Sequence, residues 1–240
     1  MPTGLKEASA PRARKQGRNL TQGMLDTLGK AIVTGSYDKS RFPTEAEIAK
    51  AHGVSRSVTR EAVKMLTAKG LVSARPRQGT AVLPASRWNL FDPDVLQWLL
   101  ERDFSVDLLR HFNQLRLAIE PEAAALAAQF HTTEDVVAIR AGLQRMTAAE
   151  AGQDDTLDAD IAFHVAILRA SHNPFYSQFQ AVVATALRTS IRFTNQIKGR
   201  SANVADHAAV ADAIGARDPD AARIAMRRII GDVLDLIAEA

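Results

Sequence analysis

The chain has 240 residues, 46% hydrophobic and 24% charged, a composition typical of a soluble globular protein with room for two domains. It has no cysteine, which excludes disulfides and thiolate chemistry, and no apolar stretch of membrane-spanning length or secretory signal. The net charge of +3 is unevenly distributed: residues 1–88 carry sixteen Lys and Arg against six Asp and Glu, which indicates a polyanionic partner for this part.

The N-terminal segment mixes Pro, Gly and basic residues without periodicity, so we expect residues 1–18 to form a disordered basic arm. From Leu20, apolar residues recur at helical spacing as far as Gly35 and predict a first helix.

The next segment, "RFPTEAEIAKAHGVSRSVTREAVKML", reads as two helices separated by a sharp turn. Thr44 followed by Glu47 is a capping box, which predicts a helix start, and Gly53 ends that helix after about two turns. Ser55 is a suitable N-cap for the second helix. We expect this second helix to lie in the major groove of DNA and to present its first turns to the bases. The residues expected to face DNA are Ser55, Arg56, Ser57, Thr59 and Arg60.

Two short β-prone runs follow at residues 71–74 and 80–83 and predict a two-stranded hairpin. Its basic tip contains Arg75, Arg77 and Gly79, which we expect to contact an adjacent groove or the phosphate backbone. Three helices and a hairpin make residues 19–85 a winged helix-turn-helix domain.

The remaining pattern is helical only. Residues 86–104, which carry both tryptophans, are expected to form a linker and a short helix at 94–101. Residues 105–238 are expected to form an all-α domain of about six helices. The expected helices are 105–130, 133–149, 156–171, 174–196, 203–216 and 219–238. The predicted fold is therefore mainly α, with an N-terminal winged helix-turn-helix and a C-terminal helical bundle.

Asp160 and His164 are four residues apart, so both project from one helical face. Asp and His at this spacing often hold a divalent metal ion, although the same spacing is more often an ordinary polar pair. An enzyme that activates a metal-bound water is one interpretation of this pair, but no convincing general base accompanies it.

The stretch "FPTEAEIAKAHGVSRSVTREAVKMLTAKGLV" with "QGTAV" resembles the DNA-binding domain of GntR-type bacterial transcription regulators. "DxxFHxxILRASHNP", "HxAVADAIxARDPDAA" and "LRLAIEPEAAALAA" resemble the all-helical effector domain, called FCD, of the FadR-type branch of that family. The resemblance implies Asp160, His164 and His207 as ligands of a divalent metal ion such as zinc, and Arg116 as the partner of an effector carboxylate. The fourth ligand usual in the family, a histidine, is replaced by Ile229.

The segment "SRWNLFDPDVLQWLLERDF", with "IEPEAAALAA" and "HNP", is similar to the sugar-acid-responsive, galactonate-like members of that branch. Arg188 is a second candidate for effector binding, although a surface role suits it equally well. The resemblance implies a cytoplasmic homodimeric repressor of sugar-acid catabolism genes that binds an operator and is released by its effector. Amino acids and hydroxy- or dicarboxylic acids stay open as alternative effectors, and a metal-dependent hydrolase is the remote alternative.

Overall fold

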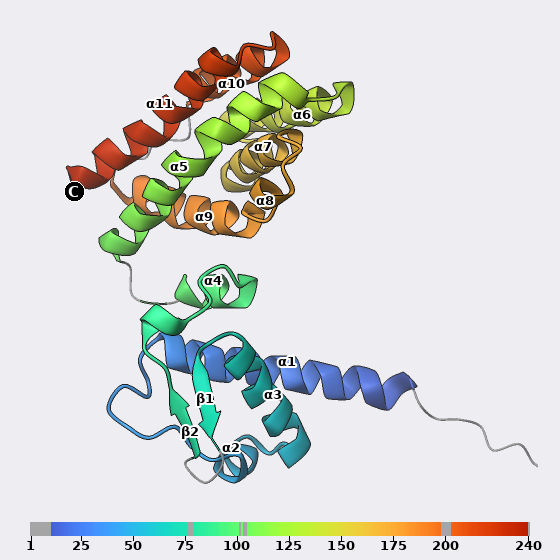
Figure 1. Ribbon diagram of the computed structural model, residues 1–240, viewed down its shortest axis with the longest axis vertical. Helices are drawn as coiled ribbons and strands as arrows, with labels where there is room; N and C mark the ends of the chain where they lie inside the picture. The colour runs from blue at the N-terminus through green and yellow to red at the C-terminus, as the bar shows by residue number, and fades with distance from the viewer. Residues whose placement is uncertain (1–10, 76–78, 101, 103–104, 198–202, 240) are drawn as a thin grey trace, which may run out of the picture. The chain divides into compact units, whose positions relative to one another are not determined.

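The computed structural model describes residues 11–75, 79–100, 102, 105–197 and 203–239, and the chain divides into two compact units, residues 1–103 and 104–240 (Figure 1). Unit 1 combines helices with a two-stranded sheet, whereas the described part of unit 2 is helical throughout. The predicted fold class, a winged helix-turn-helix followed by a helical bundle, is confirmed.

Unit 1 begins with α1 (Pro11–Val33), which starts earlier than its apolar periodicity indicates. Pro11 suits the first position of a helix, and the Ala, Arg, Lys and Gln residues that follow it are good helix formers. Helix α1 thus includes residues 11–18, which the sequence assigns to the basic arm, and residues 1–10 lie outside the described residues.

The turn between α2 (Glu45–His52) and α3 (Arg56–Ala68) forms as the sequence predicts. Thr44 and Glu47 make the reciprocal capping box, and Gly53 ends α2 with a left-handed φ of 64°. Ser55 then caps α3 by accepting a hydrogen bond from the Val58 amide. These local signals fix where α3 begins and so which residues lie at its N-terminus.

Strands β1 (Val72–Arg75) and β2 (Gly79–Val82) pair in antiparallel register, with Val72 opposite Val82 and Arg75 opposite Gly79. A 3-10 turn, η1 (Ala85–Arg87), leads to α4 (Pro93–Leu99). The side chain of Trp98 in α4 is buried and lies against α1 at Gly29, where a Cβ atom would come within 2.4 Å of the indole ring. Helix α4 therefore packs as part of unit 1.

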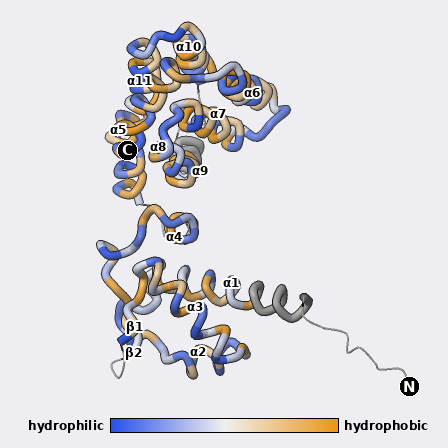
Figure 2. Tube along the Cα trace, turned by 45° about the vertical axis from the view of Figure 1, so that its right-hand side comes forward, coloured by the Kyte–Doolittle hydropathy of each residue, from blue (hydrophilic) through white to orange (hydrophobic). Residues whose placement is uncertain are grey.

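Unit 2 contains seven helices among its described residues. They are α5 (Val106–Phe130), α6 (Thr133–Glu150), α7 (Thr156–Ala170), α8 (Pro174–Ser177), α9 (Gln180–Ile197), α10 (Val204–Gly215) and α11 (Pro219–Ala238). Hydrophobic and hydrophilic residues alternate along these helices, as amphipathic packing requires (Figure 2). The helix expected over 174–196 is divided into α8 and α9, and Tyr176 and Phe179 near the break pack against the cluster around Leu168 and Val183.

The main hydrophobic core of unit 2 lies between α5, α6, α7, α10 and α11 and is centred on Phe163, Ile167 and Met226. Helices α6 and α7 approach closely at Gly142, where a Cβ atom would lie 2.8 Å from the Phe163 Cα. This core positions Asp160 and His164 of α7 and His207 of α10. No helix in the described part of the chain is long and apolar enough to span a membrane.

Candidate functional site

The first candidate site is the N-terminal end of α3. Ser55, Arg56, Ser57 and Arg60 are exposed there, and the Ser55 and Ser57 hydroxyl oxygens are 2.8 Å apart. The first amides of a helix lack intrahelical partners and form the positive end of its dipole, which favours anions such as phosphate. Two arginines on this exposed end add donors suited to phosphates and to guanine edges.

Arg60 is not free, because its Nε donates a hydrogen bond to Glu45 Oε2 at 3.3 Å. The two side chains are 62% and 37% exposed, so solvent screens the pair and it contributes little to stability. An exposed pair of this kind can exchange its carboxylate for a DNA phosphate at small cost.

The prediction that Thr59 faces DNA is wrong. Thr59 is fully buried, and its hydroxyl donates to the Ser55 carbonyl oxygen at 3.4 Å. Thr59 begins the buried stripe of α3, which Ala62, Val63 and Leu66 continue three, four and seven residues further along the helix. Its methyl group and hydroxyl instead help to anchor α3 in unit 1.

The hairpin presents two of the three residues expected at its tip. Arg75, the last residue of β1, and Gly79, the first of β2, are both exposed, and Gly79 has a left-handed φ of 84°. Arg77 lies outside the described residues.

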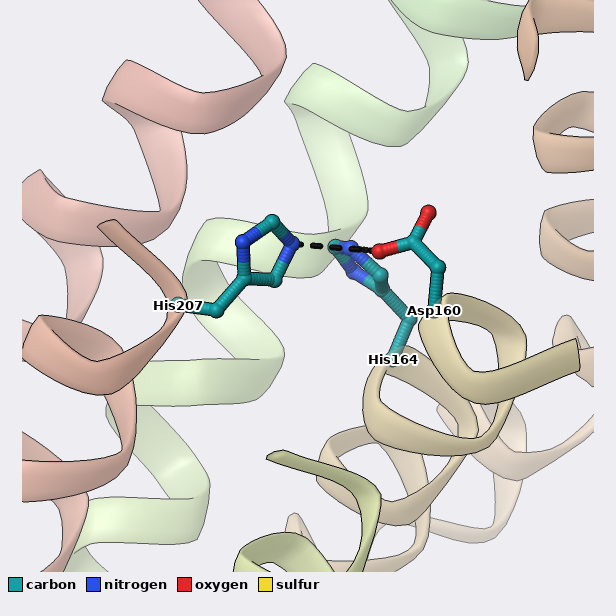
Figure 3. Close-up of side chains that lie close together, drawn as sticks. All are labelled: Asp160, His164 and His207. Atoms are coloured by element: carbon teal, nitrogen blue, oxygen red, sulfur yellow. Dashed lines mark ion pairs between the residues drawn. The ribbon is translucent and has the colours of Figure 1, made fainter. Parts of the chain in front are cut away.

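The second candidate site is a buried polar cluster in unit 2. Asp160 and His164 project from α7 and His207 from α10, and one potential ligand atom from each lies within 4.8 Å of the others (Figure 3). The distance from Asp160 Oδ1 to His207 Nε2 is 3.2 Å and that to His164 Nε2 is 3.6 Å. All three side chains are buried, so the structure brings together the three residues that the sequence proposes as metal ligands.

The other ring nitrogen of each histidine is already hydrogen-bonded. His164 Nδ1 donates to Glu120 Oε2 at 2.5 Å, and His207 Nδ1 donates to the Asn203 carbonyl oxygen at 2.7 Å. A carboxylate or a backbone carbonyl on Nδ1 is the usual outer partner of a metal-binding histidine, because it directs Nε2 toward the metal. Both rings therefore aim Nε2 at the same oxygen of Asp160.

Two of the three potential ligand atoms have no hydrogen bond. Asp160 Oδ1 and His207 Nε2 are buried without a hydrogen-bond partner in the described structure, although they lie within ion-pairing distance of each other. Two imidazoles and a carboxylate are a donor set that divalent transition metals accept. The residues present thus fit a metal ion, which would satisfy these two atoms. Ile229 on α11 is partly buried against the main hydrophobic core and supplies no ligand.

Arg116, expected to bind an effector carboxylate, is buried and bonded within the protein. Its Nε donates to Glu120 Oε1 at 2.5 Å, and its Nη1 donates to Asn113 Oδ1 at 3.2 Å. Its Nη2 lies 3.5 Å from His164 Nε2, which places Arg116 beside the metal-ligand cluster. Arg188 is half-buried on α9, and no described hydrogen bond or ion pair joins it to this cluster.

Charge interactions within the cluster outweigh the effect of burial on pKa. Burial raises the pKa of Glu120, but Arg116 and His164 lower it to about 2. Burial likewise opposes the ionisation of Asp160, yet His164 and His207 bring its pKa well below the ordinary value. For His164, burial lowers the pKa, but Glu120 and Asp160 raise it to about 9. A metal ion at His164 Nε2 would therefore displace a proton at neutral pH.

Sequence reasoning missed Glu120 and Asn113. Both lie on α5 with Arg116, at spacings of four and three residues, so all three share one helical face. Three buried polar residues on a face that also carries Leu109 and Ile119 were the available signal. The Asn203 carbonyl gives no such signal, because any residue type supplies one.

Two family descriptions match the chain. Residues 21–82 match "Bacterial regulatory proteins, gntR family", and residues 112–232, half of the chain, match the FCD domain. The Galactonate operon transcriptional repressor of Escherichia coli (strain K12) is 35% identical over 88% of this chain and 94% of that protein. The Putative L-lactate dehydrogenase operon regulatory protein of the same organism is 31% identical over 78% of this chain and 73% of that protein.

Solved structures agree on the fold. The Listeria monocytogenes regulator Lar, described as controlling expression of the agr system, aligns with a TM-score of 0.59 at 17% identity over 92% of this chain and 97% of that one. At this identity the likeness supports the fold alone. With both domain matches and the similarity along nearly the whole length of the galactonate repressor, the chain belongs to the GntR family of bacterial transcription regulators and carries an FCD effector domain.

Proposed function

We propose that the chain is a homodimeric repressor of sugar-acid catabolism genes that leaves its operator when a sugar acid binds a divalent metal ion in unit 2. Membership of a family of transcription regulators argues against the hydrolase interpretation of the cluster. One recognition helix reads only a few base pairs, so a two-fold dimer on a pseudo-palindromic operator is expected.

The observation that carries the effector site is the pair of unpartnered buried atoms, Asp160 Oδ1 and His207 Nε2. With the His207 proton on Nδ1, the two atoms are both acceptors that face each other at 3.2 Å, and leaving such an atom unsatisfied costs about 1–3 kcal/mol. A site that holds a metal ion and its ligand accounts for both atoms.

The chemistry of the site favours a hydroxylated carboxylic acid. Three protein ligands leave coordination positions open, and Ile229 adds none, so a bound metal would offer Lewis-acid positions to the carboxylate and α-hydroxyl of the acid. Arg116 lies beside the cluster and supplies a guanidinium for the same carboxylate. The galactonate operon repressor, which is similar to this chain, is named for a six-carbon sugar acid.

At the DNA, Ser55, Arg56, Ser57 and Arg60 are proposed to contact the operator together with the hairpin tip. The effector acts by favouring a dimer in which the two recognition helices no longer match the half-site spacing. It shifts the population only by the difference between its affinities for the two states.

A second candidate effector is a small hydroxy acid such as lactate, favoured by the similarity to the lactate operon regulator. A fluorescence-anisotropy titration of the chain on its operator, with galactonate, lactate, a dicarboxylate and an amino acid, separates the candidates. The proposal predicts release by galactonate or another sugar acid in the presence of Mn²⁺ or Zn²⁺. If lactate, the dicarboxylate or the amino acid releases the operator and the sugar acids do not, the sugar-acid assignment is contradicted.

A further inference from the structure

Glu120 is bonded both to Arg116, which the proposed function assigns to the effector, and to His164, which it assigns to the metal ion. Its Oε1 accepts from Arg116 Nε at 2.5 Å, while its Oε2 accepts from His164 Nδ1 at 2.5 Å and lies 3.5 Å from Arg116 Nη2. Glu120, Arg116 and His164 are each at most 2% exposed. A single buried carboxylate thus joins the guanidinium to a metal-ligand histidine.

We propose that Glu120 is an internal stand-in for the effector carboxylate: it holds Arg116 in the acid-free protein and is displaced onto His164 when the acid binds. This inference rests on the proposed function, because it takes the effector to be a carboxylic acid that reaches Arg116.

The first support is the edge of the guanidinium that Glu120 uses. Nε and Nη2 form one of the two edges through which arginine grips a carboxylate with two parallel hydrogen bonds. Glu120 occupies this edge, and Nη1 is bonded to Asn113. An acid arriving at Arg116 therefore meets a donor edge that already carries a carboxylate, and binding becomes an exchange of one carboxylate for another.

The second support is that Glu120 has a second hydrogen-bond partner. A displaced Glu120 keeps its hydrogen bond from His164 Nδ1, so releasing Arg116 does not leave a buried charge without a partner. Arg116 in turn receives the charge of the acid. The exchange preserves the pairing of both buried groups.

The third support is the position of the exchange next to the ligand atoms. Arg116 Nη2 lies 3.5 Å from His164 Nε2, so an acid held by Arg116 lies beside the metal-ligand position. A Glu120 that has left Arg116 serves His164 alone, which makes the imidazole a better ligand. Acid and metal then strengthen each other through one side chain, and by linkage the factor is the same in both directions.

The exchange also sets specificity. A neutral sugar or an amide lacks the charge needed to replace Glu120 on a buried guanidinium, so the site selects for carboxylates even among molecules of similar shape.

Glu120→Gln tests the stand-in role, and Glu122→Gln is a matched control. Glu122 lies two residues along the same helix and pairs with Arg223 at 2.7 Å near the surface. Calorimetric titrations at saturating Mn²⁺ would use galactonate and glycolate, the smallest hydroxy acid. We expect Glu120→Gln to bind both acids about tenfold more tightly, the factor by which a charged hydrogen bond exceeds a neutral one, and Glu122→Gln to match the wild type.

Glu120→Asp, which keeps the charge but shortens the reach to Arg116, provides a second variant should the glutamine protein fail to fold, and it is also expected to bind the acids more tightly. If galactonate does not bind the wild type but glycolate binding tightens in the variant, the sugar-acid assignment fails and the stand-in role holds. If galactonate binds the wild type and neither variant gains affinity for either acid, the stand-in role is overturned and the proposed function holds.

Discussion

An arginine–glutamate pair occurs in each of the two candidate sites. The two pairs differ in solvent exposure and therefore in how easily each arginine exchanges its partner. Arg60 and Glu45 meet at 3.3 Å on the surface of unit 1, with side chains 62% and 37% exposed. Arg116 and Glu120 meet at 2.5 Å inside unit 2, with side chains at most 2% exposed. The exposed pair exchanges partners cheaply, which suits a surface that binds DNA and releases it. The buried pair exchanges only for another anion, which suits a selective effector site.

The largest expected difference between the pairs is in stability. Arg116→Met removes one of the two cationic partners of the buried Glu120, although His164 stays bonded to it, and should lower the free energy of unfolding of unit 2 by about 3 kcal/mol. Arg60→Met should change the stability of unit 1 by less than about 1 kcal/mol. Urea unfolding of both variants measures this, and equal losses would remove the physical basis of the comparison.

For DNA binding, in contrast, the exposed arginines of unit 1 should matter most. Arg56→Ala and Arg60→Ala should leave the chain folded and lower operator affinity by about 1–3 kcal/mol each, the discrimination expected from one bidentate base contact. A gel-shift titration at fixed salt checks this. Unchanged affinity in both arginine variants would contradict the assignment of this face to DNA.

Much of this comparison was predictable from sequence, because the signals are local. Thr44, Glu47 and Gly53 define the turn before α3, and i, i+4 spacing places Asp160 and His164 on one face. The convergence of His207 with them was available only through family resemblance, since the residue lies on another helix. Glu120 contacts His164 across 44 positions of the chain, and no local pattern encodes that pairing. Thr59 was misplaced because it was grouped with its exposed neighbours rather than with the buried stripe of Ala62, Val63 and Leu66.

Removing one charge from the hairpin should have a smaller effect, which appears in the salt dependence of DNA binding. Arg75→Gln should reduce the slope of log K for DNA binding against log salt by about 0.9, the value for one phosphate contact, with sequence preference nearly unchanged. Binding titrations between low and moderate salt measure the slope. A slope identical to that of the wild type would mean that Arg75 is only solvated.

The smallest effect distinguishes two glutamates whose pKa is lowered to about 2 for different reasons. In exposed Glu47 the cause is hydrogen bonding from Arg41 and Thr44, whereas in buried Glu120 the charges of Arg116 and His164 overcome burial. Both groups have a folded pKa below the unfolded one, so each stabilises the fold above about pH 4.5 and loses that contribution as pH falls toward 2.

Because salt screens exposed charges far more than buried ones, 1 M NaCl should raise the pKa of Glu47 toward 4.5 and leave that of Glu120 nearly unchanged. Titration of the carboxyl ¹³C resonances at low and high salt in metal-free protein reads both values. Equal movement of the two would contradict the difference in screening.

In the proposed function, acid and metal act together in unit 2 to release DNA from unit 1. The most direct measurement is fluorescence anisotropy of a labelled operator duplex bound by the full chain and titrated with galactonate, once with saturating Mn²⁺ and once after chelation, in the wild type and in His207→Ala. The account predicts that galactonate releases the operator from metal-loaded wild type and does so far more weakly after chelation or in His207→Ala. Release at the same galactonate concentration in all three cases would show that Asp160, His164 and His207 are only polar lining and would contradict the account.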